Sequence, residues 1–159
     1  PLPTVPAAPR VKADTPVPVQ PAPSPESETP AAGLEQTMID GAVAPDDPRM
    51  AATIQAVEEG LRRGSYMLRY ALPDDFGEPK TAFNICTFWL IEVLHLSGRA
   101  AEAREMFTEM LNRRTAAGLL SEDIAFDGGE LWGNYPQTYS LVGVIQCAMR
   151  LSRRWEQVV

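Results

Sequence analysis

The sequence predicts an all-α fold of about four helices behind a proline-rich tail, and three observations carry this prediction. Ten of the fifteen prolines fall in the first thirty residues, and no aromatic residue occurs before Tyr66. Beyond residue 45, apolar residues recur at helical spacings in four separate stretches. No stretch has a credible strand pattern. We therefore expect a tail over residues 1–44 and a helical region over residues 45–159.

The tail is built mainly from Pro, Ala, Val, Ser and Glu. Such a segment cannot bury enough apolar surface to offset the entropy of ordering it. We expect it to be disordered or polyproline-like. The core is then built from roughly residues 46–155, which hold all three tryptophans.

The first expected helix begins at Asp47-Pro48, an N-cap followed by a first-turn proline. Its apolar residues recur at spacings of four, three and four before Gly64 ends the pattern, and they are Met50, Ile54, Val57 and Leu61. The segment from Ser65 to Pro79 holds Gly, Pro and Asp residues close together and is expected to form a structured loop.

The second expected helix, residues 81–96, is apolar on nearly all sides, which is typical of a helix inside a larger assembly. Ser97-Gly98 separates it from a third helix over residues 99–114, so the two should form a helical hairpin. The apolar stripe of the third helix comprises Ala103, Met106, Phe107, Met110 and Leu111.

A last helix is expected from Pro136, with Leu141, Val144, Ile145, Ala148 and Leu151 facing one way. Arg150, Arg153 and Arg154 lie at its C-terminal end, where they suit the helix dipole. Four helices fit either a self-contained bundle or a slice of a larger array of hairpins. The all-apolar second helix favours the array, with some neighbours outside this chain.

Charge and composition exclude several functional classes. The net charge is -7, and no basic run is longer than an Arg-Arg pair, so a nucleic-acid partner is not expected. The most apolar run, residues 85–96, is too short to span a bilayer, and no signal peptide is visible. We therefore predict a cytoplasmic protein.

Metal and cofactor sites are not expected either. His95 is the only histidine, whereas a structural zinc site needs four closely spaced ligands. Cys86 and Cys147 each lie in an apolar helical pattern, which favours small buried thiols in a reducing compartment. A disulfide between them remains the alternative. The prediction is no metal and no cofactor.

Several motifs occur in order in the second half of the chain: "FNICTFW", "GLLSED", "GELWGN" followed by "YPQTYS", and the closing "RLSRRWE". Together they resemble the C-terminal end of glycoside hydrolase family 15, the glucoamylase and trehalase-like enzymes. The resemblance covers about residues 44–157. It implies that residues 45–159 form the C-terminal portion of an α/α toroid whose active site lies in loops at one end.

The resemblance also implies inverting hydrolysis of an α-glucoside, with a maltooligosaccharide or a trehalose-like sugar as substrate. Inversion needs a carboxylic acid on the glycosidic oxygen and a carboxylate that activates water on the opposite ring face, roughly 6.5–9.5 Å apart. Glu122, in "SED", matches the family's general base. Considered without its flanking motifs, Glu122 would be a surface residue of a glycine-rich loop, and we expect Asp123 to cap or solvate the turn.

Four further residues match positions that contact the sugar. Arg69 and Tyr70, in "LRYALPDDFG", resemble the family's arginine and aromatic, Phe83 matches a pocket aromatic, and Ser121 offers donors beside Glu122. The alternatives are an Arg69 ion pair with Asp74 or Asp75, and packing roles for Tyr70 and Phe83. We expect Trp89 and Trp132 mainly in the core.

The chain also departs from the family pattern. Ala125-Phe126 stands where relatives commonly have Asp-Pro, and Tyr135 replaces a common Phe. The family's general acid lies upstream, in helices for which this chain shows no counterpart, and the Trp155-Glu156 pair is at the wrong end. The chain alone is therefore expected to be inactive, and its exposed apolar helix faces should drive self-association.

The competing hypothesis is a non-enzymatic scaffold for protein–protein interaction. The segment "SGRAAEAREMFTEML" has the small-residue and apolar spacing of helical-repeat hairpins. However, no fixed period of 30 to 45 residues recurs along the chain.

Overall fold

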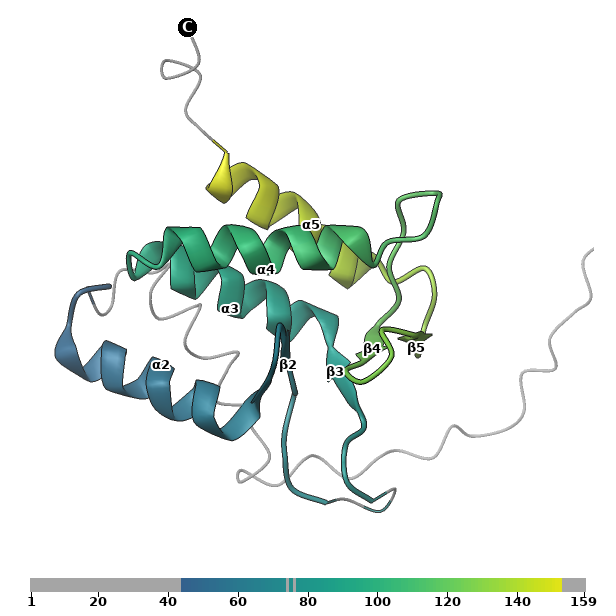
Figure 1. Ribbon diagram of the computed structural model, residues 1–159, viewed down its shortest axis with the longest axis horizontal. Coiled ribbons are helices and arrows are strands. Elements are labelled where there is room, and N and C mark those ends of the chain that lie inside the picture. Colours follow the sequence, from purple (N-terminus) through teal and green to yellow (C-terminus); the bar gives the residue numbers. More distant parts are fainter. Residues whose placement is uncertain (1–43, 74, 76, 153–159) are drawn as a thin grey trace, which may run out of the picture.

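The computed structural model describes residues 44–73, 75 and 77–152, and helices dominate this part of the chain (Figure 1). The helices are α2 (Pro48–Leu61), α3 (Asn84–Leu96), α4 (Ala100–Asn112) and α5 (Thr138–Leu151). Short strands lie between them: β1 (Arg62–Arg63), β2 (Tyr66–Met67), β3 (Thr81–Phe83), β4 (Asp123–Ala125) and β5 (Leu131–Trp132). The mainly helical fold is confirmed, whereas the strands were not predicted. The expected tail, apart from residue 44, lies outside the described residues, as do Arg153, Arg154 and the Trp155-Glu156 pair.

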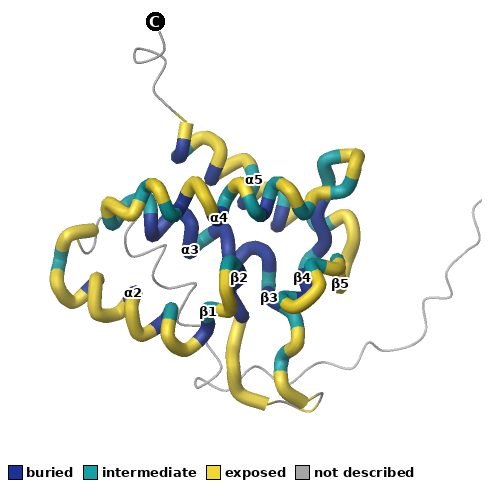
Figure 2. Tube along the Cα trace, viewed as in Figure 1, coloured by how far each residue is buried: buried dark blue, intermediate teal, exposed yellow. Residues whose placement is uncertain are grey.

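Helix α2 follows its sequence pattern closely. The Asp47 carboxylate accepts a hydrogen bond from the backbone N–H of Arg49 at 2.8 Å, and Pro48 occupies the first turn. The buried residues are the four that the periodicity indicated: Met50, Ile54, Val57 and Leu61. Figure 2 shows this helix exposed along its outer side. Gly64, with φ of +62°, then reverses the chain into the β1–β2 hairpin.

Helix α3 is the central element, since α4 and α5 both pack against it (Figure 2). It begins at Asn84 instead of residue 81 because Thr81–Phe83 pairs with β4. Its buried residues lie all around the helix: Asn84, Ile85, Cys86, Thr87, Phe88, Leu90, Ile91, Glu92, Val93 and Leu94. The expectation that α3 needs neighbours from outside this chain is therefore wrong, because the chain's own elements cover it.

Helix α4 completes the expected hairpin through a turn at Gly98, which has φ of +87°. Ala103, Met106 and Met110 are buried, and Phe107 meets Phe88 edge-on with 6.4 Å between ring centroids. The predicted apolar stripe therefore faces α3.

The core-facing side of helix α5 matches the prediction only in part: Leu151 is buried and Leu141 and Val144 pack against the core, whereas Ile145 and Ala148 are exposed. Its buried residues are Ser140, Gly143, Cys147 and Leu151, whereas Ile145 is 58% exposed. A Cβ at position 143 would lie 2.5 Å from Phe88 Cδ2, so the absence of a side chain lets the two helices approach. Hydrophobic periodicity ranks large residues first and gives little weight to such small contact residues.

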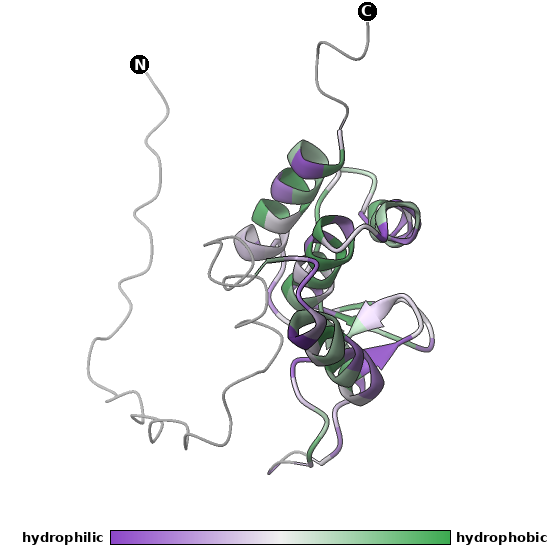
Figure 3. Ribbon diagram, turned by 90° about the vertical axis from the view of Figure 1, so that its left-hand side faces the viewer, coloured by the Kyte–Doolittle hydropathy of each residue, from purple (hydrophilic) through white to green (hydrophobic). Residues whose placement is uncertain are grey.

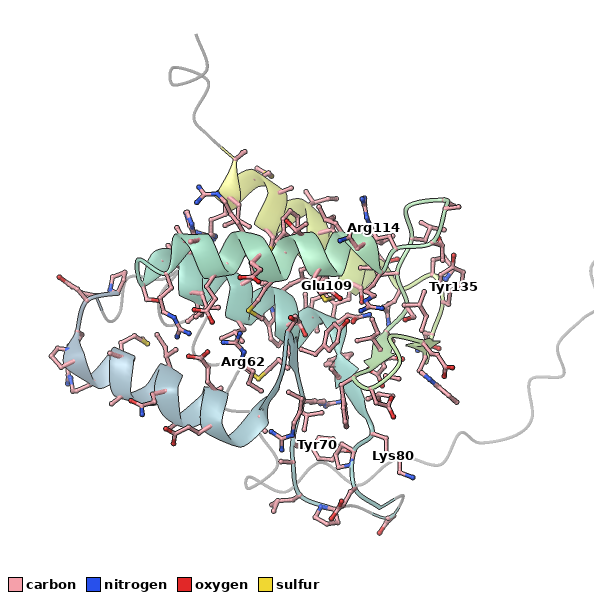
Figure 4. The ribbon with its side chains drawn as sticks, viewed as in Figure 1. Arg62, Tyr70, Lys80, Glu109, Arg114 and Tyr135 are labelled. Atoms are coloured by element: carbon pink, nitrogen blue, oxygen red, sulfur yellow. The ribbon has the colours of Figure 1, made fainter. Side chains whose placement is uncertain are left out.

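Two groups of charges tie the helices together. The Arg150 Nε donates to the Glu92 Oε2 at 3.0 Å, so an arginine expected to serve the helix dipole pairs instead with a buried carboxylate of α3. The second group joins α2 to α4. Arg62 Nη1 contacts Glu58 at 2.5 Å and Glu102 at 2.7 Å, and Arg99 pairs with the same two carboxylates. Arg62 thus lies between α2 and the α3–α4 hairpin (Figure 4).

Cys86 and Cys147 are both buried thiols, as expected, and no disulfide joins them. Burial raises the pKa of the Cys86 thiol to about 12. The Cys147 Sγ donates to the Phe88 carbonyl oxygen at 3.4 Å, so both thiols are packed against or within α3.

The unpredicted strands position the site. Strand β4 pairs antiparallel with β3 and with β5, so that Asp123 lies opposite Phe83 on one side and Trp132 on the other. This places the "SED" segment beside the start of α3. None of the described helices is long and apolar enough to cross a membrane.

Candidate active site

A pocket with a volume of about 190 Å³ opens beside the small sheet. Two segments far apart in the sequence line it, and their residues are Arg69, Tyr70, Pro79, Thr81, Phe83, Glu122 and Asp123. Figure 4 shows Tyr70 on the segment after β2 and Lys80 on the returning segment before β3. The fold therefore brings Arg69, Tyr70, Phe83 and Glu122 together, whereas Ser121 does not line the pocket.

Glu122 is anchored through its main chain. Its N–H donates to the carbonyl oxygen of Asn134 at 2.9 Å, and its own carbonyl oxygen accepts from the N–H of Asn84 at 3.0 Å. Asn84 is fully buried at the start of α3. The backbone at position 122 is thus fixed between the central helix and the loop that follows β5.

The Glu122 side chain is held by the same loop. Its Oε2 accepts hydrogen bonds from Asn134 Nδ2 at 2.9 Å and from the Asn134 backbone N–H at 3.2 Å. An ionised carboxylate is only an acceptor, and both of these partners are donors. A Cβ on Gly133, whose φ is +77°, would lie 3.0 Å from the same Oε2. The glycine therefore allows the loop to approach the carboxylate.

Asp123 lies in a different place from the one predicted. It lines the pocket and does not cap the turn, and its Oδ2 accepts from the Thr81 hydroxyl at 3.0 Å. Burial raises its pKa above the ordinary 3.8, against the lowering by the Thr81 hydrogen bond. The neighbouring Glu122 charge raises the pKa further, and Arg69 lowers it. The pocket thus holds two carboxylates in unlike environments.

Arg69, Tyr70 and Phe83 form the other side of the pocket. The Arg69 guanidinium carbon lies 5.7 Å from the centroid of the Phe83 ring, which is a cation–π contact. No ion pair joins Arg69 to Asp75 among the described residues, and Asp74 lies outside them. Tyr70 is 39% exposed, so it is not a core residue. Phe83 is half-buried and also packs against the core.

Ser121 is fully buried, and its hydroxyl donates to the carbonyl oxygen of Asp123. Its own carbonyl oxygen accepts from Asn84 Nδ2 at 2.9 Å and from the Ser140 hydroxyl at 2.7 Å. The Ser121 hydroxyl is therefore hydrogen-bonded within the loop, and Ser121 does not line the pocket.

Sequence reasoning did not single out Thr81, Pro79 or Asn134, and it expected Asp123 in the turn and not in the pocket. Asn134 stands inside the quoted motif "GELWGN", which is the one signal that could have singled it out. Trp132, expected in the core, is 54% exposed on β5. Trp89 is half-buried and meets Tyr139 edge-on, with 5.8 Å between ring centroids.

No three His, Cys, Asp or Glu residues gather to hold a metal ion within the described part of the chain. The pocket itself offers two carboxylates, a guanidinium and aromatic faces. Such a set suits a neutral polyhydroxy ligand, because carboxylates and guanidinium groups hydrogen-bond hydroxyls and aromatic rings pack on C–H faces.

The chain is similar to several curated trehalases. It is 34% identical over 121 residues to the trehalase of Thermoplasma volcanium, an overlap of 76% of this chain and 19% of the relative. It is 32% identical over 121 residues to that of Thermoplasma acidophilum, covering 76% of this chain and 21% of the relative. The trehalase of Mycobacterium tuberculosis is 28% identical over 116 residues, covering 71% and 17%.

The chain spans about a fifth of the length of the curated relatives it matches. No family model matches it, and no solved structure matches it either. The motifs that resemble the glucoamylase and trehalase-like enzymes and the similarity to named trehalases agree with each other. The chain therefore belongs to glycoside hydrolase family 15, the glucoamylase and trehalase-like family, and corresponds to part of a full-length member.

Proposed function

We propose that this chain supplies the general-base half of the active site of an inverting α-glucoside hydrolase, with Glu122 as the base. The observation that carries the proposal is the Glu122 carboxylate, held by Asn134 in a pocket that Arg69 and Tyr70 also line. Arg69 would bind sugar hydroxyls, and the Tyr70 and Phe83 rings would pack on the pyranose.

In this mechanism Glu122 takes a proton from a water molecule, and the water oxygen attacks the anomeric carbon. The bond from that carbon to the glycosidic oxygen breaks, and a carboxylic acid on the opposite side protonates the leaving oxygen. In this proposal Asp123, which directly follows Glu122 and lines the same pocket, is not that acid. The acid would come from outside the described residues.

The pocket size also supports a site in which this chain supplies the base and other residues supply the acid. Complete ligand pockets have volumes of roughly 300–1,000 Å³, whereas this one has about 190 Å³. The described residues would thus form one wall of a larger site. Because the curated relatives are named trehalases, the substrate of the complete site would be trehalose or a similar α-glucoside such as a maltooligosaccharide.

Ligand binding tests the proposal without requiring catalysis. A cationic iminosugar such as 1-deoxynojirimycin should bind the chain better than glucose, because its ammonium group meets the Glu122 carboxylate. The substitution Glu122→Gln should weaken iminosugar binding about 10-fold or more, as expected for a charged contact, and leave glucose binding little changed. Titration followed by NMR measures both ligands. Equal iminosugar binding by Glu122→Gln and the original chain contradicts the proposal.

A second prediction concerns activity. Without the acid, the reaction loses a contribution on the order of 100- to 10,000-fold. The isolated chain should therefore release no measurable glucose from trehalose or maltose. β-Glucose release by the chain, abolished by Glu122→Gln, would show that a complete acid–base pair is already present.

The proposal extends to self-association. Exposed apolar residues lie on one side of α5, namely Tyr139, Val142, Ile145 and Met149. Hydrophobic segments recur along this helix, which leads to the C-terminus in Figure 3. We define these four residues as the α5 apolar stripe. A contiguous exposed stripe of this kind would pair with a second copy in the isolated chain.

The non-enzymatic scaffold remains the second candidate, and the α5 apolar stripe is the observation that favours it. A scaffold predicts protein binding through this stripe and no response to sugars. The iminosugar titration separates the two, because Glu122→Gln alters only a carbohydrate site.

A further inference from the structure

We infer that Asn134 is the positioning residue of this site: it fixes the Glu122 carboxylate so that Oε2 is occupied and Oε1 serves the water. The inference rests on the proposed function and adds a residue to which neither the motif nor the relatives assign a role. Asn134 is itself exposed, and it contacts Glu122 through both its main chain and its side chain.

Three hydrogen bonds join the two residues. The Glu122 N–H donates to the Asn134 carbonyl oxygen at 2.9 Å, while the Asn134 N–H and Nδ2 both donate to Glu122 Oε2, at 3.2 and 2.9 Å. The contact is reciprocal, so the backbone and the carboxylate of residue 122 are fixed by one partner. The two donors on one oxygen restrain the rotation of the carboxylate about its last side-chain bond.

The surrounding loop is shaped for this contact. Gly133 lies so close to Glu122 that any side chain there would press on its Cβ and Oε2, both 3.0 Å from a Cβ at position 133. On the other side, the Asn84 N–H holds the Glu122 carbonyl oxygen. Glu122 therefore lies between the Gly133-Asn134 loop on one side and the start of α3 on the other.

An asparagine suits the task because it is a neutral donor. An aspartate has the same shape but would place a second carboxylate at the Oε2 atom, and like charges at that distance disfavour joint ionisation. An alanine would keep the backbone N–H contact and lose the Nδ2 contact. Both substitutions therefore remove the Nδ2 donor, and only the aspartate also adds a charge.

The first measurement is the contact itself, in the full 159-residue chain. NMR spectra of the Asn134 backbone and side-chain N–H groups should shift together in Glu122→Ala, because both lose their acceptor. The signals of Asn112, an exposed asparagine at the end of α4, should not move. Unmoved Asn134 signals overturn the inference.

The second measurement is ligand discrimination. Asn134→Ala should weaken 1-deoxynojirimycin binding about 3- to 10-fold, the range of one hydrogen bond, with glucose binding unchanged. Asn112→Ala serves as the matched control and should match the original chain. Equal losses for both ligands would indicate a merely structural role and overturn the inference.

A double-mutant cycle makes the outcome specific. If Asn134 acts through the carboxylate, Asn134→Ala should have no further effect on iminosugar binding in the Glu122→Gln background. Additive losses overturn the inference. If Glu122→Gln alone leaves iminosugar binding intact, the proposed function fails and this inference with it. If Glu122→Gln weakens binding and Asn134→Ala does not, only this inference fails.

Discussion

At the scale of single residues, the pocket is distinguished by two consecutive carboxylates with different surroundings. Glu122 receives two N–H donors from the loop after β5, whereas Asp123 is half-buried against Thr81 and shares the pocket with Arg69. Environment can assign unlike roles to neighbouring carboxyl groups. In the proposed function, Glu122 contacts the attacking water and Asp123 forms part of the pocket wall.

The raised pKa of Asp123 gives a prediction of pH dependence. The folded chain holds the Asp123 proton more tightly than the unfolded chain, whose ordinary value is 3.8. Stability from this group is therefore complete below about pH 3.8 and is lost as the pH rises through the folded-state pKa. Asp123→Asn removes this loss, so the stability of the variant relative to the original chain should rise between pH 3 and pH 7.

Urea unfolding followed by tryptophan fluorescence at several pH values measures this difference. Asp127→Asn, at an exposed position in the β4–β5 turn, is the matched control and should show no such trend. A stability difference between Asp123→Asn and the original chain that falls with rising pH would contradict the cause assigned here.

The sequence located part of the site and missed the rest for identifiable reasons. Glu122, Arg69 and Tyr70 stand in motifs, so their positions could be carried over from the family resemblance. The positions of Asp123 in the pocket and of Ser121 in the interior depend on the pairing of β3 with β4. These strands have only three residues each, which is too short for a recognisable sequence pattern. Asn134 touches Glu122 across a loop, and no local pattern reports such a contact.

At the scale of elements, the packing of α5 on α3 depends on the absence of a side chain at Gly143. A Cβ there would overlap Phe88, which has 1% exposure in the middle of the core. Helical periodicity predicted the existence and length of α5 but not its rotation, because its contact residues are small. The predicted start of α3, at residue 81, was also wrong, because strand β3 has only three residues and is too short to show a strand pattern in the sequence.

Gly143→Ala should therefore destabilise the chain by about 1–3 kcal/mol, the usual cost of overpacking a core. Gly60→Ala is the matched control, because Gly60 lies in α2 with nothing within 4 Å of a Cβ at that position. That substitution should stabilise the chain by about 0.4–1 kcal/mol through helix propensity and reduced freedom of the unfolded chain.

Chemical denaturation of both variants gives the two free energies of unfolding. If Gly143→Ala is as stable as Gly60→Ala, α5 does not pack against Phe88 as closely as described.

At the scale of the whole molecule, burial is uneven. The chain covers α3 on all sides but leaves the α5 apolar stripe open, with Ile145 58% and Met149 74% exposed. The sequence indicated that some helix would lack a neighbour but pointed to α3, because total apolar content does not show which face a helix turns outward. The helix that lacks a neighbour on one side is therefore α5 and not α3.

We expect the isolated chain to self-associate through this stripe. Replacing Ile145 and Met149 together with lysine should shift the molecule towards monomer, because both side chains are exposed and neither contributes to the core. Sedimentation velocity over a range of concentrations measures the change. A matched double substitution at the exposed Glu105 and Arg104 on α4 should have no effect. A concentration-independent monomer in the original chain would contradict the prediction.

The pairing of β3, β4 and β5 has a consequence for how this chain can vary. Because successive side chains of a strand stand on opposite faces, adding or deleting one residue in the 126–130 turn would exchange inside for outside along the neighbouring strand. It would also move Asn134 away from the carboxylate it holds. We therefore expect a change in the length of this turn to disrupt the pocket more than a substitution within it.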